Sequence, residues 1–182
     1  MDVEWMEEVR QRSRRGNQVL FAKDSACLRD LAELLRPAPH RVAVLWGLEL
    51  ARGSVEELEE RYPAERRPRE AWEAAWAWAS GEIKMRLAQR KILDCHALAK
   101  ELDSPADRAL CHAVGQACSI VHTAGHALGY PIYDLTALVN RLGLEHCAQA
   151  VEERRRVYTD RLLYWQEHAG EYRGAWAEFL LK

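Results

Sequence analysis

The sequence has few signals for β-structure and none for a membrane span. β-branched residues are sparse, while Ala, Leu, Glu and Arg dominate, and these four favour helices over strands. No window approaches the roughly 18 unbroken apolar residues that a membrane helix needs. The start, MDVEWMEEVRQR, lacks the apolar core of a signal peptide. These absences predict a helical protein of the cytoplasm that does not contact a membrane.

The sequence also lacks a dominant charge and a disulfide framework. Lys and Arg number 26 against 28 Asp and Glu, which gives a formal net charge of −2. No global field attracts nucleic acid, so nucleic acid is not an expected partner. The cysteines are odd in number, scattered and without a C-x-x-C pair, which predicts reduced thiols and no zinc ribbon. They are Cys27, Cys95, Cys111, Cys118 and Cys147.

Motifs for catalysis and cofactors are missing as well. There is no G-x-G-x-x-G, P-loop, G-x-S-x-G or EF-hand. Glu82, Glu101 and Glu145 do not form the spacing of a di-metal carboxylate bundle. A nucleophile built on Cys95 or Cys118 stays open, but no residue is marked out as its orienting partner. We therefore expect a protein without catalytic residues and without a cofactor.

The punctuation of the chain predicts an all-α fold. Pro68 and Pro105 open helices at a first-turn position, and Ser54 with Glu57 forms a capping box after Gly53. The expected fold is a compact bundle of about seven or eight helices with short loops. Their predicted ranges are 24–36, 39–52, 55–62, 68–80, 82–102, 105–128, 132–142 and 145–180.

The length of 182 residues suits one domain. We expect residues 24–182 to form a single all-α domain. Residues 1–23 are charged and end in SRRGNQ, so they are predicted to be either a loose arm or a short packed helix.

The seven tryptophans are placed at helical spacings. Trp72 and Trp76 share one helix face, whereas Trp78 lies about 200° round from Trp76. Their helix is therefore buried on two sides, or else Trp78 is exposed.

A heptad-like seam of large residues runs through the C-terminal segment. It predicts one helix whose seam packs on the core, with a kink near Gly170 as an option. The alternative is that the distal half forms a surface for a partner or a homodimer, which makes Trp165, Tyr172 and Trp176 candidate binding residues. The seam comprises Tyr158, Leu162, Trp165, Ala169, Tyr172, Trp176 and Phe179.

The stretch VGQACSIVHTAGHALG, residues 114–129, holds His122 and His126 at helical i, i+4 spacing. This spacing makes them weak candidates for a metal site, because zinc needs further ligands and Thr123 stands where a metalloprotease has Glu. The many small residues instead predict a thin, central helix with buried, hydrogen-bonded histidines. A metal-dependent or acid–base enzyme centred on this pair is the alternative.

Two stretches, RPREAWEAAWAWASGEI (67–83) and VGQACSIVHTAGHALGYPIY (114–133), resemble the immunity proteins of bacterial polymorphic toxin systems, in the family described as the fifth-immunity-like domain. VAVLWGLELA (42–51) fits a helix that this family carries before them, and the resemblance covers about residues 25–135. The matching residues are Trp46, Arg67, Pro68, Arg69, Glu70, Ala71, Trp78, Gly81, Glu82, Gly115, Gln116, Ala117, His122, His126 and Gly129.

The resemblance implies an all-helical, non-enzymatic protein that binds and neutralises a cognate protein toxin. Immunity surfaces are often acidic, so the run EELEE (56–60) is a candidate surface for the toxin. Its acidic residues are Glu56, Glu57, Glu59 and Glu60.

Overall fold

The computed structural model describes residues 4–182 and confirms the all-α fold, with no strand among these residues. The α-helices are α1 (Glu4–Arg14), α2 (Arg29–Leu35), α3 (His40–Arg61), α4 (Arg67–Ala79), α5 (Met85–Leu98), α6 (Pro105–Ser119), α7 (Gly129–Leu142) and α8 (Ala148–His168). Short 3₁₀ turns cover Ala26–Leu28, Ala124–His126, Ala169–Glu171 and Glu178–Leu180. In the described part of the chain, the helices are too short or too polar to span a bilayer.

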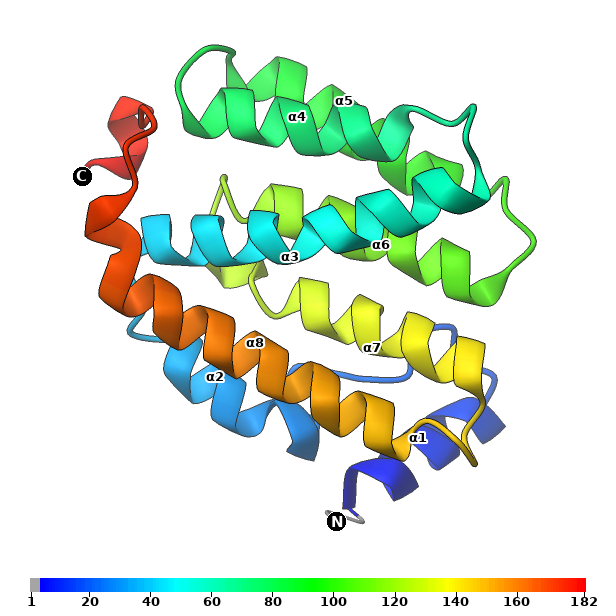
Figure 1. The fold of residues 1–182 in the computed structure, drawn as a ribbon. Coiled ribbons are helices and arrows are strands. Elements are labelled where there is room, and N and C mark those ends of the chain that lie inside the picture. The colour runs from blue at the N-terminus through cyan, green and yellow to red at the C-terminus, as the bar shows by residue number, and fades with distance from the viewer. Residues whose placement is uncertain (1–3) are drawn as a thin grey trace.

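From α3 onward, successive helices run back and forth along the molecule (Figure 1). The end of α4, the end of α6 and the residues after α8 therefore meet at one end, which we call the tail end. The end of α3, the turn between α5 and α6 and the end of α7 meet at the opposite turn end. This arrangement brings side chains from segments that are distant in sequence close together at each end.

Helix α6 is central, because it packs against α3, α4, α5 and α7. Small residues make this possible. A Cβ at Gly115 would lie 2.3 Å from the imidazole of His96 on α5, so only glycine allows that ring to lie against the helix. The predicted thin, central helix is therefore confirmed for residues 105–119.

The predicted helix over 105–128 is too long. The positions predicted for His122 and His126 are therefore also wrong. The chain leaves α6 at Ser119, and Thr123 is extended and caps the next turn by accepting a hydrogen bond from Gly125 N. His122 and His126 therefore lie on a loop and not on one helix face, and both are exposed. The prediction that they are buried was wrong.

The predicted break between 39–52 and 55–62 is also wrong, since α3 is continuous from His40 to Arg61. The Ser54 hydroxyl is buried and lies 2.9 Å from the Tyr130 hydroxyl, and that hydroxyl donates to Leu50 O. The Ser54 hydroxyl is therefore hydrogen-bonded to Tyr130 of α7 and does not cap a new helix.

The single C-terminal helix predicted over 145–180 ends at His168. Two glycines, Gly170 and Gly174, lower helix propensity beyond that point. The tail, residues 169–182, then docks on α4: Ala177 N donates to Ala79 O at 2.7 Å, and Leu180 is buried. Tyr158 and Leu162 are in the core, but the seam does not continue as one helix.

Within the segment 1–23, the structure places α1 against the bundle. Trp5 and Val9 are buried, and Trp5 Nε1 donates to Glu152 Oε1 on α8 at 3.0 Å. Residues 1–3 of that segment lie outside the described residues. The division into an arm and a domain of 24–182 stays a prediction.

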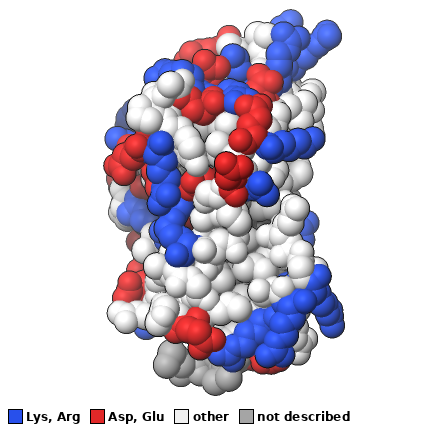
Figure 2. Space-filling view, turned by 90° about the vertical axis from the view of Figure 1, so that its right-hand side faces the viewer, with Lys and Arg blue, Asp and Glu red and all other residues white. Residues whose placement is uncertain are grey.

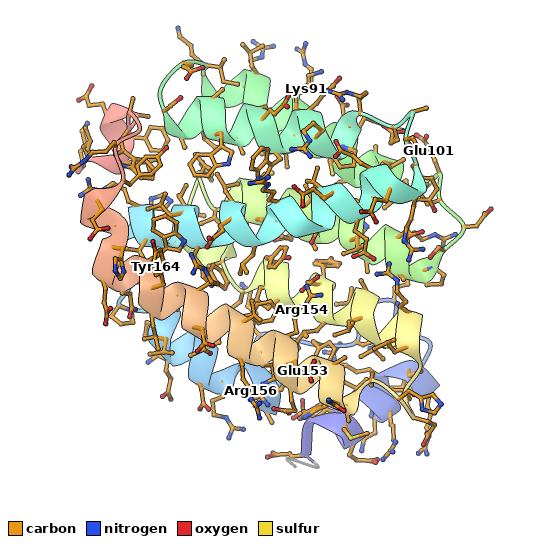
Figure 3. All side chains as sticks on the ribbon, viewed as in Figure 1. Lys91, Glu101, Glu153, Arg154, Arg156 and Tyr164 are labelled. Atoms are coloured by element: carbon orange, nitrogen blue, oxygen red, sulfur yellow. The ribbon has the colours of Figure 1, made fainter. Side chains whose placement is uncertain are left out.

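A charge network around the buried Asp134 joins α7 to α8, and its cation, Arg154, is labelled in Figure 3. The Asp134 carboxylate accepts hydrogen bonds from Arg154 at 3.0 and 3.3 Å and from the Tyr158 hydroxyl. Asp134 is 3% exposed, and burial raises its pKa although Arg154 opposes that shift. Because the carboxylate would be costly to bury alone, the network fixes α8 on α7.

Candidate functional site

A groove of about 410 Å³ opens at the tail end between α4 and the tail. Three rings line it, those of Trp72, Trp76 and Tyr172, together with the carboxylates of Glu73 and Glu82. We call it the aromatic groove. Trp72 and Trp76 are adjacent on α4 because four residues make one helical turn, and both are half-buried.

The rings of the aromatic groove pack on one another. The Trp72 and Trp76 rings meet edge-on with centroids 6.3 Å apart, and Tyr172 stacks on Trp76 at 6.1 Å with planes 22° apart. Trp72 Nε1 donates to Leu48 O at 2.8 Å, which fixes that ring on α3. Gly174 lets Tyr172 fold back, because a Cβ there would lie 2.2 Å from the tyrosine hydroxyl.

The charge of the groove is negative. Among the described residues that line it, Glu73 and Glu82 are charged and none is Lys or Arg. The nearby Arg69 lies over the Trp72 ring at 5.3 Å, but Glu59 holds its guanidinium through two hydrogen bonds of 2.7 and 2.8 Å. Aromatic faces and carboxylates both attract cations, so the groove suits a Lys or Arg side chain of another molecule.

Next to the groove, Trp78 lies on a second buried face of α4. It is 6% exposed, and it packs between the rings of His122 at 6.2 Å and Phe179 at 6.0 Å. Of the two alternatives for this helix, the structure therefore shows burial on two sides. His122 serves as a surface ring over Trp78, and Phe179 joins the tail to the same stack.

His122 and His126 do not belong to a group of three potential metal ligands among the described residues. Burial lowers the His126 pKa, and His122 and Lys23 add to that shift. Within residues 4–182, no three His, Cys, Asp or Glu side chains lie together in a way that could hold an ion.

The acidic run 56–60 lies near the turn end (Figure 1), and its Glu59 is linked to the aromatic groove through Arg69, which lies over the Trp72 ring. Its carboxylates are largely engaged within the chain: Glu56 pairs with Arg52, Glu57 with Arg141, and Glu59 with Arg69. Glu60 is exposed. Paired carboxylates attract a cationic partner less strongly, so this run is a weaker candidate surface than it appeared from the sequence.

The other predicted binding residues separate into two places. Tyr172 and Trp176 remain together in the tail, with ring centroids 4.9 Å apart. Trp165 lies on α8, where its Nε1 donates to Glu49 Oε2 at 2.7 Å and the same carboxylate pairs with Arg161. The sequence did not single out Trp72, Trp76, Glu73 and Glu82 as residues that line one groove, although the tryptophan spacing on α4 placed Trp72 and Trp76 on one face.

The motif residues that carry the family resemblance mostly hold helices together. Trp46 is fully buried and donates to Tyr158 O at 2.9 Å. Arg67 joins the start of α4 to the α5–α6 turn through Glu101, with contacts of 2.7 and 2.8 Å. Glu70 pairs with Lys91 on α5 at 2.8 Å.

The glycines of those motifs also have structural roles. Gly81 has φ +85° and turns the chain after α4, beside Ala177 of the tail. A Cβ at Gly129 would lie 2.3 Å from the Gln116 side-chain oxygen, so these two motif residues pack directly on each other. Pro68 begins α4, whereas Glu82 lies on the rim of the aromatic groove.

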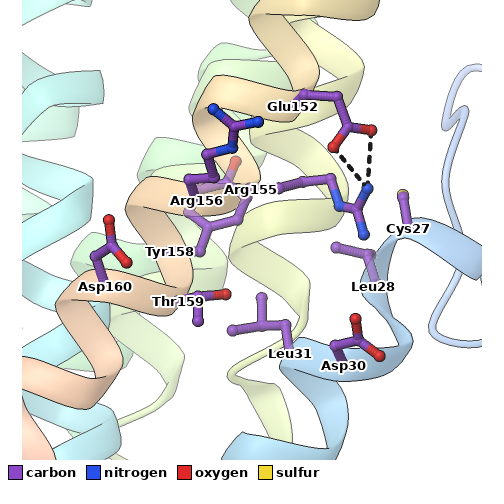
Figure 4. A pocket seen from close by; sticks show the side chains of 10 residues that line it. All are labelled: Cys27, Leu28, Asp30, Leu31, Glu152, Arg155, Arg156, Tyr158, Thr159 and Asp160. Atoms are coloured by element: carbon purple, nitrogen blue, oxygen red, sulfur yellow. Dashed lines mark hydrogen bonds and ion pairs between the residues drawn. The ribbon is translucent and has the colours of Figure 1, made fainter. Parts of the chain in front are cut away.

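A smaller hollow of about 210 Å³ lies between α2 and α8 (Figure 4). Arg155 is held there by Glu152 at 2.8 Å, and Asp30, Asp160 and Arg156 add charges of both signs. Burial raises the pKa of the Cys27 thiol to about 12, which makes it a poor nucleophile. With three carboxylates against two guanidinium groups and a thiol of raised pKa, this hollow offers neither a strong charge nor a reactive group.

Comparison with known proteins gives one family. The model described as "Imm-5 like putative immunity protein" matches residues 33–161, which extends the expected resemblance into α8 and starts it within α2. No curated protein and no solved structure matches the chain. Because the matched stretch covers well over half of the 182 residues, the chain belongs to the Imm-5 like immunity protein family.

Proposed function

We propose that this protein is a non-catalytic immunity protein of the bacterial cytoplasm that binds a cognate toxin and blocks it through the aromatic groove. One observation carries this proposal: the groove presents Trp72, Trp76 and Tyr172 beside two carboxylates that are not neutralised by a Lys or Arg of its described lining. Trp and Tyr are the residues that most often dominate protein interfaces. The toxin is expected to insert a Lys or Arg side chain between these rings.

The groove suits a tight contact because its rings are already fixed. Trp72 is hydrogen-bonded to Leu48 O, and Trp76 is held between Trp72 and Tyr172. Binding here loses little conformational entropy, because these side chains are already ordered. More of the favourable contact energy therefore contributes to the affinity.

The experiment measures binding of the toxin encoded by the adjacent gene by isothermal titration calorimetry. Trp76→Ala should weaken the complex by about 30-fold or more, the effect of a central aromatic residue. Tyr164→Ala is the matched control, because Tyr164 is an exposed ring on α8 outside the groove. Equal affinities for wild type and Trp76→Ala would refute the proposed surface.

The two carboxylates give a second test. Glu73→Gln with Glu82→Gln should slow association and reduce its dependence on salt, because rim charges act mainly on the encounter rate. The control is Glu153→Gln on α8, an exposed carboxylate outside the groove. An unchanged association rate would mean that the partner brings no cation to this groove.

Blocking is tested in cells. Cells that express the toxin should grow when wild-type protein is present and should stop growing with Trp76→Ala. Growth without this protein, or full protection by a chain that no longer binds the toxin, would contradict neutralisation by binding.

The alternative for the C-terminal seam is that it forms a homodimer interface, in which case the tail would contact a second copy of the chain. The tail already packs on α4 of its own chain, with Tyr172 stacked on Trp76. Light scattering at high concentration separates the two uses, since a dimer dissociated by Trp176→Ala would favour self-association.

A further inference from the structure

A cavity of about 610 Å³ lies at the turn end between α6, α7, the α5–α6 turn and the loop 16–19. Its polar lining includes Lys100, Arg108, His112, Tyr133 and Asn140. We call it the basic cavity. Its volume is within the usual range of about 300–1,000 Å³ for small-molecule sites.

The two cations of the basic cavity have no acidic partner. Neither Lys100 nor Arg108 forms an ion pair with a carboxylate of residues 4–182, and no Asp or Glu of these residues lines the cavity. Arg108 Nε donates to Leu102 O, which orients the guanidinium group, while its terminal nitrogens have no hydrogen-bond partner among the described residues.

The neighbouring carboxylates are engaged elsewhere. Glu101, next to Lys100, is held by Arg67 of α4, and Figure 3 shows it at the turn end. Asp107, next to Arg108, is buried and accepts hydrogen bonds from Tyr62 and Arg141. The positive charge of the cavity is therefore not cancelled by the acids closest in sequence.

Figure 2 shows the face at the turn end. Lys and Arg are mixed with Asp and Glu in its upper half, uncharged surface crosses its middle, and a patch of Lys and Arg lies below, towards α1. Helix α1 carries Arg10, Arg12 and Arg14 in its second half. An anion that approaches the lower half of this face meets mainly positive charge.

His112 adds a donor to the basic cavity. Its Nδ1 lies 2.8 Å from His96 Nδ1, so one of these two nitrogens must carry a hydrogen and the other must accept it. When His96 Nδ1 carries the hydrogen, His112 Nδ1 is the acceptor. Neutral His112 then carries its hydrogen on Nε2, and Tyr133 holds the ring from the other side at 5.2 Å.

The loop wall of the cavity is also fixed. Arg12 donates to Val19 O at 3.2 Å, and Leu20 N donates to the Thr136 hydroxyl of α7 at 3.1 Å. The loop 16–19 is thus tied to α1 on one side and to α7 on the other.

We propose that the basic cavity binds a small anion that bears carboxylate or phosphate groups, with Lys100, Arg108 and His112 as its donors. Guanidinium and ammonium groups bind such anions through charge-assisted hydrogen bonds. This site lies at the opposite end of the bundle from the aromatic groove and does not depend on the proposed toxin contact.

Calorimetry with citrate and with pyrophosphate, at constant ionic strength, tests the proposal and separates carboxylate from phosphate. At least one of them should bind, and glucose should not. Lys100→Gln with Arg108→Gln should weaken that binding at least tenfold. The matched control, Arg86→Gln with Arg90→Gln, removes two exposed charges from α5 outside the cavity and should leave the affinity unchanged.

A single substitution in the cavity gives a second, independent test of anion binding. Asn140→Asp places a carboxylate in the lining at an exposed position, so it should weaken anion binding at least tenfold while the thermal unfolding midpoint stays near that of the wild type. The proposal is overturned if neither anion binds, if Asn140→Asp binds as well as the wild type, or if the α5 control loses as much affinity as the cavity variant.

Discussion

The aromatic groove and the basic cavity are built by different means. The basic cavity is lined by α6, α7, the turn between α5 and α6, and a loop tied to α1 and α7. One wall of the aromatic groove is the tail, which has no α-helix and meets the end of α4 through one backbone hydrogen bond, a few rings and Leu180. The groove should therefore be the more easily disrupted of the two sites.

The difference in construction matches the difference in proposed ligand. A small anion needs donors held at fixed separations, and α6 provides this for Arg108 and His112, one helical turn apart. A protein partner contacts a wider surface, and a wall that shifts slightly can adapt to it. The chain thus combines a stiff end and a more adaptable end around one core.

The largest expected loss comes from the network that supports both ends. Arg154→Met leaves the buried Asp134 without its cation and should lower the free energy of unfolding by about 4 kcal/mol near pH 8. The loss should be smaller near pH 5, because the Asp134 pKa is already raised by burial and the carboxyl can take up a proton. Urea unfolding at both pH values measures this, with the exposed Arg156→Met as control.

The next effect separates the two ends. Leu180→Ala should cost about 3 kcal/mol, because Leu180 is 4% exposed and anchors the tail. It should loosen the aromatic groove and leave anion binding in the basic cavity unchanged. Leu181→Ala, at a residue 57% exposed, is the matched control. Equal damage to both sites would show that the tail and the cavity are not independent.

A third substitution disturbs the basic cavity instead of the tail, through the contact between Gly115 and His96. Gly115→Ala should lower the free energy of unfolding by about 2 kcal/mol, because the new methyl group displaces the His96 ring and breaks its hydrogen bond to His112. Gly53→Ala, at a helix position with nothing within 4 Å, should instead add about 0.5–1 kcal/mol. A destabilised Gly53→Ala would undermine this explanation.

The smallest effect is the pH dependence of the histidine pair. Burial, with repulsion from His112, lowers the His96 pKa to about 4, against about 6.5 for an unfolded chain. The unfolded state thus binds the proton first, so this stability is fully present above pH 6.5 and is lost as the pH falls from 6.5 to 4. The His96 contribution to the slope should reach at most about 1.4 kcal/mol per pH unit, and the slope should be smaller by that contribution in His96→Gln. An identical slope in this variant would contradict the assignment.

The sequence predicted the elements whose signals are local. The prolines at Pro68 and Pro105 opened α4 and α6 as expected, and Ser104 accepts a hydrogen bond from Asp107 N as a cap should. The capping box at Ser54 failed because Tyr130, 76 residues away, takes its hydroxyl. Local patterns cannot reveal such a distant partner.

The sites were harder to predict, because each joins segments that are distant in sequence. Tyr172 stacks on Trp76 only because the chain leaves its helix at His168 and returns to α4. The His96–His112 pair depends on how α5 is rotated against α6. Gly115 was the usable signal, since a glycine within a helix often marks a close approach by a neighbour.

Hydrogen exchange of this protein, free and bound to the adjacent toxin, tests the central claim most directly. We predict that protection on binding is concentrated in residues 72–82 and 172–178, which form the aromatic groove. Protection of the acidic run 56–60 or of the basic cavity, with the groove exchanging as in the free protein, would contradict the account.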